Sequence, residues 1–230
     1  EVLRAVAEAA AQEGVPEAVA HEWAERYARE IVPSFSTFAY FGFPIRLARS
    51  INGLFYDVRV GRLDHGLAKV ERDAAVVFVM NHRSNMDYML VTVLAADRTA
   101  LSYAVGEWAR VWPLSKLIKA LGAYFIRRKS RDALYRKVLA RYVRMATDAG
   151  VTQAVFPEGG LSLDGRVAPP KMGILKYIIE GHDLSLRDVV FVPVALNYDR
   201  VMEDRVLIAA GQAGERKFRA SVWTVFGFVL

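Results

Sequence analysis

The chain has 230 residues, of which 53% are apolar and 24% are charged, and its formal net charge is +6. This composition is too apolar for a disordered protein and suffices for one sizeable hydrophobic core. The sequence contains no cysteine, which excludes disulfides, thiolate catalysis and cysteine-based metal sites. No uninterrupted apolar stretch approaches the roughly 18 residues that a membrane-spanning helix requires.

The positive charge is concentrated in the middle of the chain. Residues 1–30 contain seven acidic and three basic side chains, whereas residues 116–144 contain ten basic side chains and a single acid, Asp132. Such a basic region favours an anionic partner. Nucleic acid, an anionic lipid surface and a phosphorylated substrate all meet this requirement.

The amino-terminal part of the chain is predicted to be helical. Residues 1–31 have a helix-forming composition that is interrupted at Gly14-Val15-Pro16, and residues 32–56 are aromatic, basic and amphipathic. We expect the second of these segments either to lie in a membrane interface or to pack an apolar face on the core. The predicted domains are therefore a helical, membrane-interface segment at 1–56 and an α/β domain at 57–230, which we expect to belong to a longer chain.

Predicted strands and helices alternate beyond this segment. Strands are predicted at 54–60, 75–80, 100–105, 123–126, 152–156 and 189–194, the last with an extension over 196–198. Helices are predicted up to 96, at 113–121, at 131–149 with Gly150 as the carboxyl-terminal cap, and at 172–180. This order predicts the α/β class, with a central mixed, largely parallel sheet flanked by helices.

A candidate base and an orienting carboxylate occur together in Asn81-His82-Arg83-Ser84-Asn85-Met86-Asp87-Tyr88, between a predicted buried strand and a predicted helix. His82 then lies in a loop, and Asp87 can curl back to accept a hydrogen bond from one ring nitrogen. The other nitrogen can take a proton from a substrate hydroxyl, as in a catalytic triad whose nucleophile is the substrate. The alternative is a capping or packing pair without a catalytic role.

Two further groups of polar residues follow predicted strands, where open α/β sheets bind ligands. The guanidinium groups of Arg127 and Arg128 can hold a phosphate, although a solvated basic helix entrance has the same residues. At Glu158, Gly159 and Gly160, backbone amides can approach an anion and the carboxylate can bond a hydroxyl or an arginine. An ordinary turn has this composition too.

A last basic group precedes the helix predicted at 172–180. Lys171 lies close to the start of this helix and Arg166 lies in the loop before it. A lysine there can reinforce an anion site. The alternative is a surface lysine beside Pro169 and Pro170.

In order and spacing, these blocks resemble the glycerol-phosphate acyltransferase superfamily, whose hallmark is a His-x4-Asp motif. The resemblance covers about residues 74–198. Asn-His-Arg-Ser-x-x-Asp-Tyr, Gly-Ala-x-Phe-Ile-Arg-Arg, Glu-Gly-Gly and Pro-x-Lys-x-Gly are most similar to the bacterial glycerol-3-phosphate 1-O-acyltransferase branch. The chain departs from that pattern at Leu161, where an arginine is usual, which leaves lysophosphatidate as an alternative acceptor.

The resemblance implies acyl transfer from an acyl-coenzyme A or acyl-carrier-protein thioester to glycerol-3-phosphate, the first step of phospholipid synthesis, with His82 as base and Asp87 as its orienter. It assigns acceptor binding to Arg127, Arg128, Glu158, Gly159, Gly160, Arg166 and Lys171. We expect no metal, no cofactor besides the acyl donor and no nucleic-acid partner. We also expect peripheral or monotopic attachment to an anionic membrane surface at the cytoplasmic face of the inner membrane.

Two rival functions come from other classes. A serine hydrolase would need a Gly-x-Ser-x-Gly turn, and Gly160-Leu161-Ser162-Leu163-Asp164 lacks the last glycine. A non-catalytic binder of anionic lipid or nucleic acid would account for the basic region but gives no reason for His82 and Asp87 to share a loop.

Overall fold

The computed structural model describes residues 1–34, 56–61, 70–71, 73–84, 86–95, 101–106, 122–127, 130–180, 182–183, 185–201 and 204–212, with single positions or pairs at 42, 46, 49–50, 53–54 and 119. Most of the predicted amphipathic segment, most of the helix predicted at 113–121, and Arg128 lie outside these residues.

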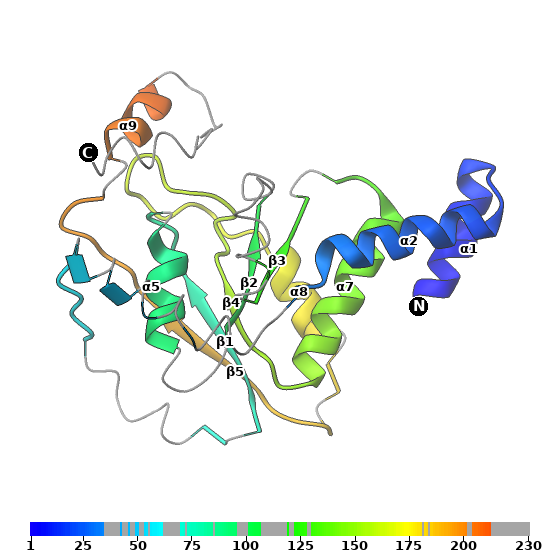
Figure 1. Cartoon of the computed structure of the whole chain (residues 1–230), viewed down its shortest axis with the longest axis horizontal. Coiled ribbons are helices and arrows are strands. Elements are labelled where there is room, and N and C mark those ends of the chain that lie inside the picture. Colours follow the sequence, from blue (N-terminus) through cyan, green and yellow to red (C-terminus); the bar gives the residue numbers. More distant parts are fainter. Residues whose placement is uncertain are drawn as a thin grey trace.

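Five strands form one sheet in the described part of the chain (Figure 1). They are β1 (Ala75–Met80), β2 (Leu101–Val105), β3 (Ala123–Phe125), β4 (Thr152–Val155) and β5 (Val189–Val194). Their order is β3-β2-β4-β1-β5, and all four neighbouring pairs are parallel. The α/β prediction is confirmed, and the described sheet is parallel throughout because the connections between its strands are long enough for crossovers.

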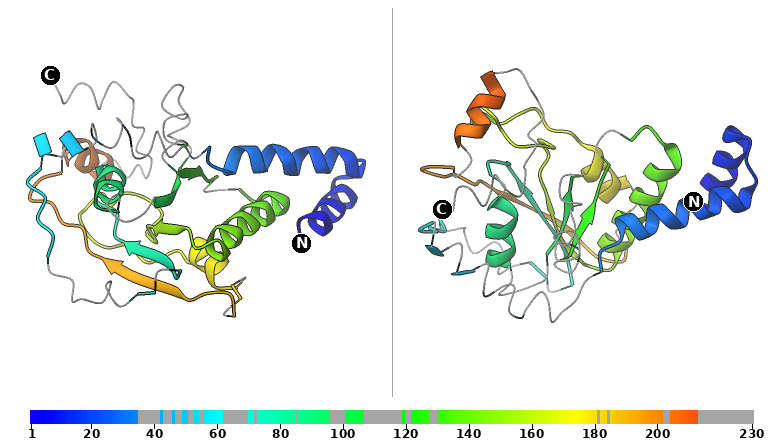
Figure 2. Two further views of the ribbon diagram at one scale, coloured as in Figure 1. Left: turned by 60° about the horizontal axis from the view of Figure 1, so that its bottom comes forward. Right: turned by 45° about the horizontal axis from the view of Figure 1, so that its top comes forward.

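Helices cover both faces of this sheet (Figures 1 and 2). The described helices are α1 (Val2–Glu13), α2 (Glu17–Ile31), α5 (Met86–Ala95), α7 (Ala133–Asp148), α8 (Gly173–Glu180) and α9 (Asp204–Gln212). One face packs against α5, and the opposite face packs against α7 and α8. The amino-terminal hairpin of α1 and α2 packs against α7 and extends away from the sheet.

The apolar run of β1 reflects its central position. Val77 faces the α7 side of the sheet, whereas Met80 faces the α5 side, and both are buried. A parallel strand that is covered on both faces requires apolar residues in succession instead of in alternation. The strand predicted here from that run is confirmed at the predicted residues.

The ends of α7 follow from local side-chain and backbone chemistry. Asp132 is its amino-terminal cap, because one carboxylate oxygen accepts a hydrogen bond of 3.0 Å from the amide of Tyr135. Ala149 is the carboxyl-terminal cap residue, and Gly150 follows it with a φ of 72°. Gly150 therefore supplies the left-handed residue that ends the helix, one position after the cap itself.

Two predicted strand segments are wrong. Residues 53–54 are helical and residues 56–61 have no regular structure. The apolar residues that alternate in this segment do not form a buried face, since Val58 and Val60 are 40% and 66% exposed. The extension predicted at 196–198 is not a strand either, because the backbone of Leu196 bonds the side chain of Asn81. Helix α9 was not predicted.

Candidate active site

The parallel sheet brings three loops together at the carboxyl ends of its strands. Since β1 lies between β4 and β5, the loop after β1 is flanked by residues 156–171 on one side and residues 195–198 on the other. The side chain of Asn81 ties β1 to the segment after β5, donating to the carbonyl of Leu196 at 2.8 Å and accepting from its amide at 2.7 Å. This is the sheet edge at which the polar residues were predicted to meet.

His82 and Asp87 form a buried pair. The distance from His82 Nδ1 to Asp87 Oδ2 is 2.8 Å, and the two side chains are 3% and 0% exposed. A carboxylate can only accept, so Nδ1 carries the proton and donates it to Asp87. Nε2 is then the ring nitrogen with a lone pair for a substrate proton.

The start of α5 places the Asp87 carboxylate. Ser84 Oγ accepts from the amide of Met86 at 3.1 Å, and the Ser84 carbonyl accepts from the amide of Asp87 at 3.1 Å. The carboxylate turns back over this turn, and Oδ2 accepts from the amides of Arg83 at 2.7 Å and Ser84 at 3.0 Å. The same turn that starts the helix therefore fixes the group that orients His82.

A fourth donor reaches Asp87 from the far side. The hydroxyl of Tyr198, in the segment after β5, donates to Asp87 Oδ1 at 2.6 Å. The sequence prediction missed this residue and treated it as part of a strand. No signal in the sequence alone points to it, because only the strand order brings the end of β5 beside β1.

Two aromatic rings enclose the imidazole. The ring centroid of Phe156 lies 4.4 Å from that of His82, and the Tyr88 centroid lies 5.1 Å away in an edge-to-face arrangement. These contacts restrict the imidazole to one orientation and keep water from its sides.

Glu158 is buried and binds backbone, and its role as a ligand of a hydroxyl or an arginine stays a prediction. One carboxylate oxygen accepts from the amide of His82 at 2.9 Å, and the other accepts from the amide of Ala168 at 3.0 Å. The side chain is 6% exposed. It therefore joins the His82 loop to residues 156–171 and satisfies two backbone donors.

Further contacts hold the same two loops together. The amide of Ser162 donates to the His82 carbonyl at 3.0 Å, and the guanidinium of Arg83 donates to the carbonyl of Gly165. The hydroxyl of Ser162 donates to the carbonyl of Arg166 at 2.7 Å, as a turn residue does. The amide of Arg166 lowers the pKa of Asp164 by bonding its carboxylate, while the Arg166 side chain itself is exposed.

Gly159 and Lys171 lie against each other. Gly159 has a φ of 67°, and a methyl group on its Cα would lie 3.1 Å from Lys171 Cδ and 3.2 Å from Nζ. The amide of Lys171 donates to the Pro157 carbonyl at 2.7 Å. Gly159 and Lys171 thus lie in residues 156–171, the segment that Glu158 connects to His82. Lys171 is exposed to solvent.

Arg127 lies apart from His82. Its guanidinium donates to both carboxylate oxygens of Glu30, at 2.9 and 2.7 Å, and packs over the rings of Tyr27 and Tyr135. The hydrogen bonds that Arg127 donates to Glu30 raise the pKa of Arg127. β3 is three strands from β1, or about 14 Å at the usual strand spacing. Arg127 therefore connects the loop after β3 to α2.

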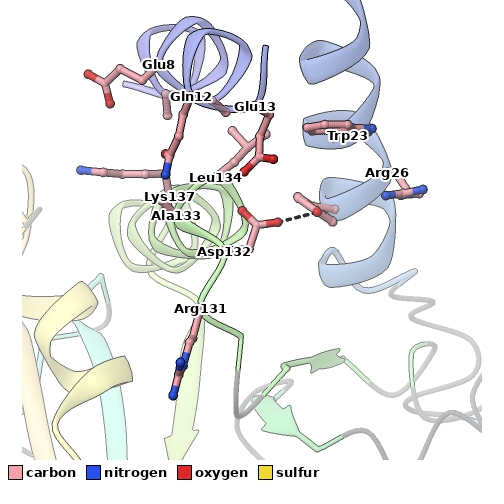
Figure 3. Close-up of a pocket in the computed structure, with 13 residues that line it drawn as sticks. Glu8, Gln12, Glu13, Trp23, Arg26, Arg131, Asp132, Ala133, Leu134 and Lys137 are labelled. Atoms are coloured by element: carbon pink, nitrogen blue, oxygen red, sulfur yellow. Dashed lines mark hydrogen bonds between the residues drawn. The ribbon is translucent and has the colours of Figure 1, made fainter. Parts of the chain in front are cut away.

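A pocket of about 520 Å³ lies between α1, α2 and the first turn of α7, and none of the predicted site residues that the structure describes lines it (Figure 3). Acidic Glu8 and Glu13 and basic Arg26 and Lys137 line it together. Tyr27 donates to Asp132 at 2.5 Å in its wall, and burial together with this bond raises the pKa of Tyr27. Neither His82 nor Asp87 lines this pocket.

Among the described residues, no group of three or more histidine or carboxylate side chains could hold a metal ion. In the same part of the chain, no helix is long and apolar enough to cross a membrane.

The chain is similar to several bacterial proteins. It is 31% identical to a glycerol-3-phosphate acyltransferase of Alteromonas mediterranea over 88% of this chain and 25% of that protein. It is 29% identical to a protein of the same name from Pseudomonas fluorescens over 99% of this chain and 27% of that protein. The chain thus spans about a quarter of the length of the curated relatives that it matches.

A structural comparison finds the crystal structure of the 1-acyl-sn-glycerophosphate acyltransferase of Thermotoga maritima. The TM-score is 0.46 and the sequence identity is 21%, with 75% of each chain covered. The family model described as Acyltransferase matches residues 62–197, which is more than half of the chain and includes every residue of the His82 loop. The chain therefore belongs to the acyltransferase family.

Proposed function

We propose that the protein transfers an acyl group from an acyl-coenzyme A or acyl-carrier-protein thioester to glycerol-3-phosphate. The observation that carries this proposal is the buried His82–Asp87 pair, which leaves Nε2 as the base at the ligand-binding edge of a parallel sheet. The names of the relatives support the choice of acceptor.

In the proposed reaction, His82 Nε2 takes the proton of the acceptor hydroxyl while that oxygen attacks the thioester carbonyl carbon. Asp87 holds the ring and stabilises the imidazolium that forms. The tetrahedral intermediate then expels the thiolate, which receives the proton from Nε2 and leaves as a thiol. A positioned base of this kind contributes about 10²- to 10⁴-fold to the rate.

Acceptor binding is proposed for the loop after β4. Gly159 and Gly160 bring backbone close to the site, and the exposed cations Lys171 and Arg166 are the candidate phosphate ligands on this loop. Arg128 remains a proposed ligand from the sequence alone. No metal or further cofactor is needed, since a thioester is sufficiently activated for direct attack.

Attachment to an anionic membrane surface also remains a proposal. The acyl donor and the product are poorly soluble, and the basic middle of the chain is attracted to anionic headgroups. Sedimentation of the protein with anionic liposomes at low salt, and its release at high salt, would support this attachment.

The function is tested by the release of free thiol from palmitoyl-coenzyme A. Glycerol-3-phosphate and lysophosphatidate are offered separately to the wild type, to His82→Ala and to the control His21→Ala, whose side chain is half exposed on α2. Transfer to glycerol-3-phosphate that only His82→Ala loses is the expected result. Transfer to lysophosphatidate alone would identify lysophosphatidate as the acceptor, which is the alternative that Leu161 leaves open. Thiol release that persists in His82→Ala would refute the mechanism.

A further inference from the structure

We propose that Tyr198 is a positioning residue for His82 and acts through the carboxylate of Asp87. Asp87 is 0% exposed, and its two oxygens are used differently. Oδ2 accepts from His82 Nδ1 and from two backbone amides, whereas Oδ1 accepts from the hydroxyl of Tyr198. This inference rests on the proposed role of His82 as the base.

The Tyr198 hydroxyl fixes the rotation of the carboxylate. Oδ2 is already held by the amides of Arg83 and Ser84, and the 2.6 Å bond from Tyr198 to Oδ1 adds a second fixed point that opposes rotation about the Cβ–Cγ bond. Oδ2 is then kept 2.8 Å from Nδ1, with the imidazole in one tautomer and one orientation. The same bond withdraws negative charge from Asp87, because a donor to one oxygen competes with the imidazolium for the charge of the carboxylate.

Tyr198 is itself held in place by contacts from three parts of the chain. Its ring packs edge-to-face on Tyr56 at a centroid distance of 5.3 Å and lies against the apolar cluster under α5. The segment that carries it is fixed two residues earlier, where Asn81 binds both backbone groups of Leu196. The hydroxyl therefore does not have to be ordered when substrate binds.

The test substitution is Tyr198→Phe, which removes the hydroxyl and keeps the ring. Its matched control is Tyr124→Phe on β3, where the hydroxyl is buried and has no hydrogen-bond partner among the described residues. Among the described residues, the ionisable side chains in contact with the pair are Tyr88, whose ring lies against His82, and Glu158, which accepts from the His82 amide; Arg83 contacts Asp87 through its backbone amide, and neither substitution replaces any of these residues.

In acyl-transfer assays of the full chain, Tyr198→Phe is expected to lower kcat about three- to tenfold, the value of one hydrogen bond, with each KM within about twofold of wild type. The ascending limb of kcat against pH should move to higher pH, because Asp87 then carries more negative charge and stabilises the imidazolium more strongly. Tyr124→Phe should behave as wild type. An unchanged kcat, or a loss of kcat with an unmoved pH profile, would overturn the inference.

A second measurement does not depend on activity. In protein with isotope-labelled histidine, the ring signals of His82, identified with His82→Ala, are followed against pH by NMR. Tyr198→Phe should move the His82 transition to higher pH. If this shift is seen in a protein whose wild type transfers no acyl group, the proposed function fails and this inference stands. Identical His82 transitions in the two proteins would refute it.

Discussion

The substitution Glu158→Gln separates a structural role of Glu158 from a role in substrate binding. The carboxylate offers an acceptor to each of two backbone amides, those of His82 and Ala168. A glutamine at the same place has one acceptor oxygen and one amino group that only donates. One of the two amides must therefore face a donor and lose its hydrogen bond; the bond of the His82 amide is buried, whereas that of the Ala168 amide is part-buried.

The magnitude follows from this geometry. A buried donor left without a partner costs about 1–3 kcal/mol. For a protein of this size, each kcal/mol corresponds to a change in Tm of about 2–4 °C, so the loss should be about 2–12 °C. If the glutamine oxygen keeps the amide of Ala168, the backbone of His82 moves as well and kcat falls.

The assay is urea and thermal unfolding of the wild type, Glu158→Gln and the control Glu180→Gln, together with the KM for the acceptor. Glu180 lies on α8, where its side chain is 61% exposed and pairs with Lys176, so its substitution should change stability by less than about 1 kcal/mol. A Glu158→Gln protein with wild-type unfolding midpoints and a raised acceptor KM would refute the structural assignment and return Glu158 to the substrate site.

Two further predictions concern the neighbouring loops. Glu30→Gln should lower the free energy of unfolding by about 1 kcal/mol, because the partly exposed Arg127 loses its charged partner. In urea unfolding this loss should become smaller at high salt, and a loss that does not depend on salt would contradict the prediction. Gly159→Ala should lower the free energy of unfolding by about 1–2 kcal/mol, because an alanine at this position must adopt a left-handed conformation. The added methyl group should also displace Lys171, so that the acceptor KM rises more than kcat falls. An unchanged KM would show that Lys171 does not contact the acceptor.

The sequence predicts the sheet well where its strands are covered on both faces. β1 is a short apolar run, and β4 is a short strand, Thr152–Val155, that is buried throughout; both are confirmed within a residue or two. The segment 54–60 has the same kind of residues but no buried face, and only tertiary structure decides that. Burial of the segment is therefore what separates the correct predictions from the wrong one.

The candidate site is less predictable than the sheet. The contact between His82 and Asp87 is local, and a five-residue spacing suffices to propose it. The strand order is not encoded in spacing, so the sequence could not place Glu158 and Tyr198 beside that pair or Arg127 three strands away. Residue type alone likewise could not show that the carboxylate of Glu158 accepts hydrogen bonds from two backbone amides.

The amino-terminal hairpin has a consequence for how the protein unfolds. Val6, Ala20 and Ile31 are at most 1% exposed and belong to the same apolar cluster as Val77 of the central strand. Helices that share a core with the sheet melt with it in one cooperative transition, unlike an appendage that opens at lower free energy. Amide hydrogens in the middle of α2 should therefore exchange with solvent as slowly as those of β1, and the hairpin would belong to the folding unit of the acyltransferase domain.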